Sequence, residues 1–187
     1  EEWHFETQVI ASVLSADQTG TSDVVGITAA SAALAVSNIP FQGPVAGVKV
    51  GRVDGKFVIN PDLATLEKSD LHLVVAGTAD AVMMVEGGAN EQPEAVMLGA
   101  IEAAHAEIKR IVARILELQE KLVEKSYLSA RLYYDLKEYR AATVSLANSL
   151  KEYPNTKYRE ELMYLKLDAL YLYAVNSVPE KKVERYQ

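Results

Sequence analysis

The distribution of glycine and proline sets the strongest limit on how this 187-residue chain can fold. All ten glycines lie at or before Gly99, and no proline follows Pro93 until Pro154. Residues 100–153 therefore contain neither of the two residues that most readily interrupt a helix. The sequence predicts that a long helix fills much of this stretch, and that strands and tight turns are confined to the residues before it.

Apolar residues within this stretch recur at helical spacing. Seven residues separate the members of one row, and a second row lies three positions on: Ile101, Ile108, Ile115 and Leu122, then Ala104, Ile111 and Leu118. Pro93 suits the first turn of a helix, so we expect one amphipathic helix from about Pro93 to Leu136. It should pack on a sheet through Ile101 and Ile108, and on residues 141–153 through Leu128 and Leu132. The stripe between them is covered either by the chain's own core, which is favoured, or by another copy of the chain.

Composition divides the chain near its middle. All ten tyrosines lie between Tyr127 and Tyr186, whereas all three phenylalanines lie in the first 57 residues. Residues 1–92 hold 4 Lys/Arg against 12 Asp/Glu, and residues 93–187 hold 15 against 14. These contrasts indicate two segments of different history.

The first segment has the pattern of a mixed α and β fold. Thr7–Leu14 is apolar and strand-like, and Ser22 or Asp23 can cap a helix of small residues that we expect to be buried against a sheet. Asp54-Gly55 predicts a tight hairpin. A short helix should begin near residues 60–62, and a second strand pair should turn near residues 78–80.

Composition excludes several classes of protein. The chain has no cysteine, which rules out disulfides and thiolate metal sites. The net charge of −7 disfavours a general electrostatic grip on nucleic acid. No apolar run is long enough to span a membrane, and no signal peptide is evident. The expectation is a soluble protein of unknown location that binds neither membrane nor nucleic acid.

Long stretches of the first segment resemble the RNase PH family, and within it the first core domain of bacterial polynucleotide phosphorylases. They are ETQVIASVLSAD (residues 6–17), ITAASAALAVSNIPFQGPVAGVKVGRVDGKFVINP (27–61) and LHLVVAGTADAVMMVEGGANEQPEAVMLGAI (71–101). The resemblance implies a layered α/β fold. It also implies phosphorolysis of RNA from the 3′ end with inorganic phosphate and Mg²⁺, in a ring of three subunits.

The chain departs from the family where phosphate should bind. Active members carry a Gly-Thr-Arg loop before the small-residue helix, because an arginine fork and helix N–H groups hold phosphate oxygens. This chain has Gly20-Thr21-Ser22-Asp23, which lacks the arginine and adds an acid that would repel an anion. The resemblance also implies that the second core domain is the catalytic one. We therefore expect no catalytic residue and no cofactor in this chain.

Metal ligation is the alternative use of several polar residues. The resemblance would place Mg²⁺-binding carboxylates near Asp62, Glu67 and Asp70, although helix capping and solvation explain these acids more simply. Three histidines, His4, His72 and His105, lack ligand spacing and are interpreted as structural. The prediction is that no metal site is present.

The second segment has the spacing of a tetratricopeptide repeat. The positions that match are Ala130, Tyr133, Tyr139, Ala142, Leu146 and Pro154. Residues 126–187 resemble BamD-like outer-membrane assembly lipoproteins, but the lipidated cysteine of that family is absent. The tyrosines should form a core in preference to a peptide site. Four basic residues, Arg131, Arg140, Lys151 and Arg159, alternate with acids and do not form a phosphate site.

The two resemblances lead to a hypothesis about the whole chain. The linking stretch, residues 106–126, has the composition of an idealised helix. We interpret the chain as an engineered chimera, α+β followed by all-α, divided into an RNase PH-like fragment (1–92), a connecting helix (93–126) and tetratricopeptide-like helices (127–187). Its expected function is structural, without catalysis. The alternative is a fragment that binds RNA or a peptide, and self-association through the long helix or a former trimer surface is also left open.

Overall fold

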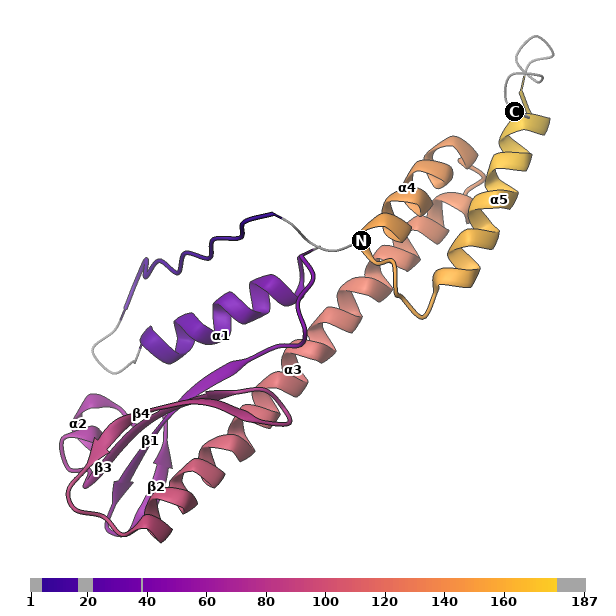
Figure 1. The fold of residues 1–187 in the computed structure, drawn as a ribbon. Coiled ribbons are helices and arrows are strands. Elements are labelled where there is room, and N and C mark those ends of the chain that lie inside the picture. The colour runs from indigo at the N-terminus through magenta and orange to yellow at the C-terminus, as the bar shows by residue number, and fades with distance from the viewer. Residues whose placement is uncertain (1–4, 17–21, 38, 178–187) are drawn as a thin grey trace. The chain divides into compact units, whose positions relative to one another are not determined.

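The computed structural model describes residues 5–16, 22–37 and 39–177. The chain divides into two compact units, Glu1–Leu118 and Gln119–Gln187 (Figure 1). Each unit has its own hydrophobic core. The boundary between them lies inside one helix, and the expected division at residues 92 and 126 stays a prediction.

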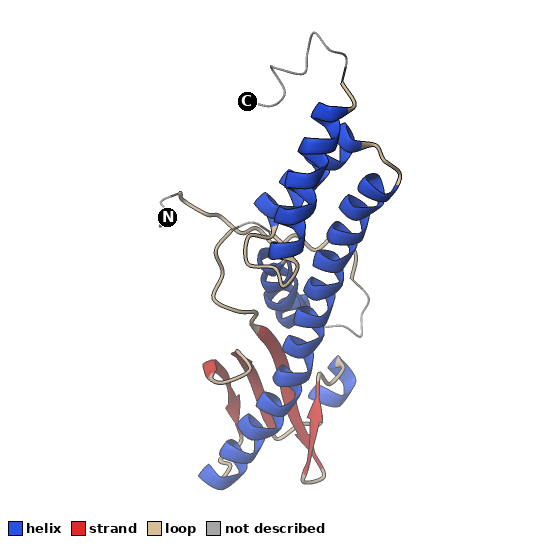
Figure 2. Ribbon diagram, turned by 90° about the vertical axis from the view of Figure 1, so that its right-hand side faces the viewer, coloured by secondary structure: helices blue, strands red, loops and turns tan. Residues whose placement is uncertain are grey.

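The first unit is built on a four-stranded antiparallel sheet. In spatial order the strands are β2 (Lys56–Ile59), β1 (Ala46–Val53), β3 (Leu71–Gly77) and β4 (Val82–Ala89). Figure 2 shows the sheet with a long helix running across it. The mixed α/β fold with a long helix and further helices, as expected from the sequence, is confirmed.

Local turn chemistry explains how the strands connect. Asp54 and Gly55 both have positive φ, 49° and 74°, as the tight β1–β2 hairpin requires. The Asp62 carboxylate accepts a hydrogen bond from the Thr65 N–H at 2.7 Å and begins α2 (Leu63–Leu66). The Thr78 hydroxyl accepts from the Ala81 N–H at 3.1 Å in the β3–β4 turn. These turns confirm the predicted hairpin, short helix and strand pair.

Helix α1 (Ser22–Ala35) packs on β1 through hydroxyl groups as well as apolar contacts. The backbone N–H of Gly47 donates to Thr28 Oγ1 at 3.2 Å, and that of Val45 donates to Ser31 Oγ at 2.7 Å. The expectation that this helix is buried against a sheet holds for one side only, since Val25 is 64% exposed. Small residues allow the close approach, but only one side of the helix makes it.

Helix α3 (Glu94–Asp135) is the long helix that the sequence predicts, and it contains 42 residues. Within the first unit its buried residues are mainly Ala100, Ala104, Ile108 and Val112, which pack against the apolar face of the sheet. Ile101 is only partly buried beside them. The buried face of this part of α3 therefore follows spacings of four residues, and not the seven-residue row that begins at Ile101.

The predicted strand at residues 7–14 is not present. These residues join no sheet in the structure, and Ile10 and Leu14 are 75% and 95% exposed. The segment runs alongside α1, where a side-chain carbon built on Gly26 would lie 3.8 Å from Ala11 Cβ (Figure 1). A strand needs a partner for its backbone groups, and the described sheet does not provide one here.

The second unit contains the last part of α3, α4 (Tyr139–Glu152) and α5 (Arg159–Val175). Its core consists of Tyr127, Ala130, Ala142, Leu146, Leu162, Leu165 and Ala169. The expectation that Leu128 and Leu132 make this contact is wrong, because both are more than half exposed. Tyr127 takes their place, stacked on Tyr158 with ring centroids 4.2 Å apart. The hydroxyl of Tyr127 reaches a polar partner that a leucine could not use.

Candidate functional site

The N-terminus of α1 is where the sequence analysis places a possible phosphate site. Gly20 and Thr21 lie outside the described residues, whereas Ser22 and Asp23 form the first turn of the helix. Asp23 Oδ1 accepts a hydrogen bond from the Val24 N–H at 2.9 Å. Asp23 Oδ2 lies 2.7 Å from Nζ of Lys49.

Lys49 reaches this position because of strand alternation. On β1, Val48 and Val50 point into the core under α3, so Lys49 between them points to the opposite face of the sheet, where α1 packs. Lys49 is only 8% exposed. The sequence analysis missed this residue, although one lysine within an apolar strand is a signal that a charged partner lies nearby.

Electrostatics favour an ionised Asp23 at this site. Partial burial would raise the pKa of Asp23, but the hydrogen bond from Lys49, the Val24 N–H and the lysine charge outweigh it and lower that pKa. The position that would attract an anion at a helix N-terminus therefore already holds a carboxylate. The only buried cation described beside it is neutralised by the same carboxylate.

A second polar cluster surrounds Arg52 on β1. Its guanidinium donates to Asp70 Oδ2 at 3.3 Å and to Gln92 Oε1 at 2.5 Å. Ser69 Oγ accepts from the Arg52 N–H at 2.7 Å. The cluster joins the start of β3 and the segment before α3 to β1. Its interactions stabilise the fold, and the sequence analysis did not anticipate Arg52 or Gln92.

The three candidate metal-binding acids have separate structural roles. Asp62 begins α2, Glu67 is exposed at the end of that helix, and Asp70 pairs with Arg52. Among residues 5–16, 22–37 and 39–177, no three His, Asp or Glu side chains lie close enough together to hold a metal ion. The structure therefore does not bring these acids together.

The two described histidines lie in different parts of the first unit. His105 on α3 has Nε2 3.2 Å from the carbonyl oxygen of Thr78. His72 lies on β3, and its buried Nε2 has no hydrogen-bond partner among the described residues. The third, His4, lies outside the described part of the chain.

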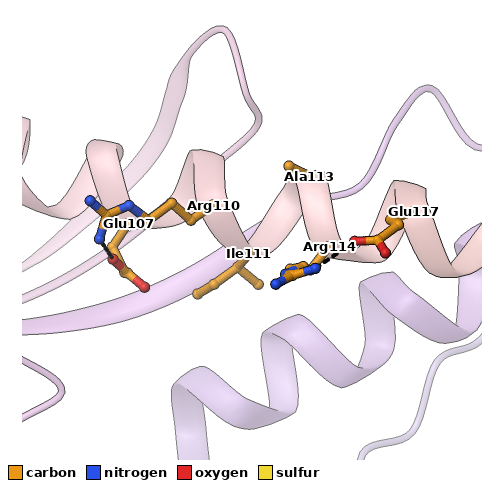
Figure 3. A pocket seen from close by; sticks show the side chains of 6 residues that line it. All are labelled: Glu107, Arg110, Ile111, Ala113, Arg114 and Glu117. Atoms are coloured by element: carbon orange, nitrogen blue, oxygen red, sulfur yellow. Dashed lines mark hydrogen bonds and ion pairs between the residues drawn. The ribbon is translucent and has the colours of Figure 1, made fainter.

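A hollow of about 570 Å³ lies along α3 in the first unit. Its lining residues are Glu107, Arg110, Ile111, Ala113, Arg114 and Glu117 (Figure 3). Arg110 pairs with Glu107 at 3.1 Å, and Arg114 pairs with Glu117 at 2.6 Å. A groove lined by one helix, with its arginines paired to acids of the same helix, lacks the convergent polar groups of a ligand site.

The second unit uses its tyrosines to bind carboxylates. The Tyr127 hydroxyl donates to Glu161 at 2.6 Å and accepts from Arg131 at 2.7 Å. The Tyr134 hydroxyl donates to Asp168, which together with burial raises the pKa of Tyr134 to about 12.

Of the other basic residues considered above, Arg159 donates to the Pro154 carbonyl oxygen, while Arg140 and Lys151 are exposed on α4. The structure does not gather the four basic residues into one site.

Residues 43–107 match the 3′ exoribonuclease family, domain 2. This range covers the whole sheet and the first part of α3, so the match and the observed α/β fold agree. The RNase PH-like part of the expected fold is supported on both grounds.

Individual relatives carry the name polyribonucleotide nucleotidyltransferase. The protein of Heliobacterium modesticaldum is 58% identical over 118 residues, which cover 63% of this chain and 16% of that protein. That of Bacillus licheniformis is 53% identical over 139 residues, covering 71% of this chain and 19% of the relative. That of Syntrophomonas wolfei is 43% identical over 185 residues, covering 95% and 26%. The chain thus spans about a quarter or less of the length of these relatives.

The interpretation of the chain as an engineered chimera with a purely structural function is wrong. The alignment with the Syntrophomonas wolfei protein covers 95% of the chain, so similarity to a single protein continues past residues 106–126 into the C-terminal helices. The comparisons also give no support to the resemblance of residues 126–187 to BamD-like lipoproteins. In the described ranges, no helix is both long enough and apolar enough to cross a membrane.

Proposed function

We propose that this chain forms an RNase PH-type core domain of a 3′ exoribonuclease that acts on polyribonucleotides. The observation that supports this most strongly is the match of residues 43–107 to domain 2 of that family, in the part of the chain that forms the sheet. The relatives' name supports the choice of polyribonucleotides as substrate. Because the chain covers at most 26% of those relatives, the activity of the whole protein is part of the proposal.

Within such an enzyme, this domain would support the reaction of a different domain. Phosphorolysis needs a site for inorganic phosphate, and an anion is best held where N–H groups and cations are unpaired. Here Asp23 takes the first-turn N–H of Val24 and the ammonium group of Lys49. A phosphate ion would have to displace a carboxylate that the chain itself supplies. The proposed role is therefore to build the enzyme, without binding the attacking phosphate.

A segment replacement tests the first part of this proposal. The matching segment of the Syntrophomonas wolfei protein is replaced by this chain, which is 43% identical to it. The hybrid should fold and release nucleoside diphosphate from poly(A) in the presence of phosphate and Mg²⁺. A control hybrid with Ile108→Asp, which places a charge in the core, should lose that activity through loss of folding. A folded but inactive parent hybrid would contradict the proposal.

The second part is tested on the chain alone. Incubated with poly(A), phosphate and Mg²⁺, it should release no nucleoside diphosphate above a blank, and ³¹P line widths of inorganic phosphate should stay unchanged. An Asp23→Ser variant frees Lys49 and the Val24 N–H, so it should broaden the phosphate signal. Phosphate-dependent product from the parent chain would show that this domain binds the attacking phosphate after all.

A further inference from the structure

The first half of β1 extends beyond the end of its neighbour β2. Strand β2 has four residues and pairs with residues 50–53, whereas β1 has eight residues and continues back to Ala46. On its other side, β1 pairs with β3 from Ala46 onward. Alternate residues of a strand direct their N–H groups to opposite sides. The N–H groups of Gly47 and Lys49, and that of Val45 just before the strand, therefore face the side where β2 is absent.

Two of these N–H groups are bound by hydroxyl groups of α1. Thr28 Oγ1 accepts from the Gly47 N–H at 3.2 Å, and Ser31 Oγ accepts from the Val45 N–H at 2.7 Å. The Thr28 hydroxyl also donates to the Val24 carbonyl of its own helix at 3.0 Å. That bond fixes the direction of the hydroxyl hydrogen, so the oxygen is free to accept from the strand.

The third N–H group is bound by Asn60, directly after β2. Asn60 Oδ1 accepts from the Lys49 N–H at 2.9 Å, and the Asn60 N–H donates to the Lys49 carbonyl at 2.8 Å. Asn60 has a φ of 49°, a conformation in which a strand does not continue. A side-chain oxygen of Asn60 thus accepts the bond that a backbone carbonyl of a longer β2 would accept.

The position of α1 is specified by one side of the helix and by a glycine on the strand. Val24 and Ser31 are 3% and 4% exposed, and Thr28 lies between them at helical spacing. A side-chain carbon built on Gly47 would lie 3.2 Å from Cδ1 of Ile27, so a larger residue there would push the helix away. Helix α1 accordingly lies beside this end of β1 (Figure 1).

We propose that α1 and Asn60 close the β1 edge against an extended segment of another chain. A strand edge with free N–H groups is a template on which a further strand can add. Here the N–H groups that an added strand would bind already hold the oxygen atoms of Thr28, Ser31 and Asn60. Helix α1 therefore takes the place of a strand, and its displacement would open the edge at residues 45–49. This device does not depend on the function proposed above.

Amide hydrogen exchange of the full chain, followed by NMR, tests the hydroxyl contacts. Thr28→Val keeps the shape of the side chain and removes its oxygen, so exchange at Gly47 should become faster relative to Val48 by about tenfold, the equivalent of one lost hydrogen bond. The Val48 N–H faces β3 and reports any general loss of stability. Thr28→Ser, which keeps the hydroxyl, should retain the ratio of the parent.

Thr143→Val is the matched control for this measurement. Thr143 Oγ1 donates to the Tyr139 carbonyl within α4, as Thr28 Oγ1 donates within α1, but Thr143 belongs to the second unit. The control should leave the ratio of Gly47 to Val48 exchange unchanged. An unchanged ratio in Thr28→Val, or an equal rise in Thr143→Val, would overturn the proposal.

Displacement of α1 tests whether the edge then accepts a strand. Ser31→Lys places a charge at a buried position of α1, whereas Ala33→Lys places one on the exposed side of the same helix. In sedimentation equilibrium, Ser31→Lys should show a higher weight-average mass than the parent at the same concentration, and Ala33→Lys should match the parent. The Gly47 amide of Ser31→Lys should exchange more slowly at high protein concentration than at low, because an added strand covers it.

The double variant Thr28→Val/Ser31→Ala repeats this test without a new charge and should shift the mass in the same direction. Association in which the Gly47 amide stays equally fast at all concentrations would indicate contact through apolar surface, and would overturn the proposal. So would a double variant that keeps both the mass and the Gly47 exchange rate of the parent.

Discussion

The ion pair between Asp23 and Lys49 neutralises a nearly buried charge in the first unit. Lys49 is nearly buried, and a buried ammonium group without a partner is strongly unfavourable. Asp23 supplies the partner from the first turn of α1, where its carboxylate also interacts favourably with the helix dipole. One acid thus neutralises a strand lysine, fixes the start of a helix and fills an anion position.

Replacing Asp23 by Asn should make stability less dependent on acid. The pKa of Asp23 is lower in the folded chain than its usual 3.8, so its contribution to the free energy of unfolding is present above that value and is lost as pH falls through the lowered pKa. In urea titrations near neutral pH the variant should be less stable by about 1 kcal/mol, since Asp23 is half exposed. That difference should shrink below about pH 4.

Glu67→Gln serves as the control for this pH dependence, because Glu67 is an exposed acid in the same unit. Its stability difference from the parent should stay small across the range. A constant difference between Asp23→Asn and parent down to about pH 2 would contradict the role assigned to Asp23.

Tyr134 should be the last tyrosine of the second unit to ionise. Its hydrogen bond to Asp168 and its burial raise its pKa to about 12, and a raised pKa contributes stability below the ordinary value of 10.0 that is lost as pH rises toward the folded value. Ultraviolet titration of the parent should show a late tyrosine step, since the pKa values of Tyr127 and Tyr153 are also raised but only that of Tyr134 reaches about 12. Asp168→Asn should move that step to lower pH, whereas Tyr133→Phe, a change at an exposed position, should leave it in place.

Residue-scale contacts were the least predictable part of the site from sequence. Asp23 was identified because it is an added acid in the loop that lacks the expected arginine, but its partner is 26 positions away on a strand. Nothing local to either residue specifies that pairing. Asp62 was different, because a capping acid and the N–H it binds lie three residues apart, and its role was correctly favoured.

At the scale of elements, the pairing of β3 with β4 depends on one glycine. Gly87 has φ of 151°, and a side-chain carbon built there would lie 2.0 Å from the carbonyl oxygen of His72 on the paired strand. Gly88 beside it has no heavy atom within 4 Å of the same built position. Two adjacent glycines therefore have very different tolerance for a methyl group.

Gly87→Ala should separate the two strands locally and cost about 3 kcal/mol or more, from the clash and the strained backbone combined. Gly88→Ala should change the free energy of unfolding by no more than about 1 kcal/mol. Hydrogen exchange of the β3 amides, with urea denaturation of both variants, provides the measurement. Equal destabilisation by the two alanines would contradict the close approach at Gly87.

A helix or turn could be predicted wherever the residues that specify it lie close together in the sequence. Asp54-Gly55, the Asp62 cap and the run free of glycine and proline each specify a turn or helix within a few residues, and each element was correctly predicted. The strand expected at residues 7–14 failed because strand formation depends on a partner. The buried face of α3 was misassigned for a similar reason, since the neighbouring elements select which residues of an apolar helix they cover.

At the scale of the whole molecule, two cores are formed by one chain. Ile108 is fully buried in the core of the first unit, and Leu146 is fully buried in that of the second. The tyrosines all follow residue 126, so tyrosine fluorescence reports on the second unit. Circular dichroism at 222 nm reports on both.

Shortening a buried side chain in one core should therefore affect a different signal from shortening one in the other core. Leu146→Ala should cost about 2–5 kcal/mol and lower the midpoint of the tyrosine transition. Ile108→Ala should lower the free energy of unfolding by a similar amount, and this loss should be visible by circular dichroism. The same variant should shift the midpoint of the tyrosine fluorescence transition only a little. The control is Leu116→Ala, at a 43% exposed position on α3. Identical shifts of both signals in both core variants would show that the two cores unfold as one.

Strand β1 lies at the centre of the first unit, and its burial has a consequence for slow motion. It pairs with β2 on one side and β3 on the other, and residues 46–51 are all buried. Small openings at the sheet edges do not release amides in such a strand to water. The hydrogen-bonded β1 amides should thus keep their deuterium label longest in this unit and exchange only when the unit unfolds completely, so their rates would record its global stability without any denaturant.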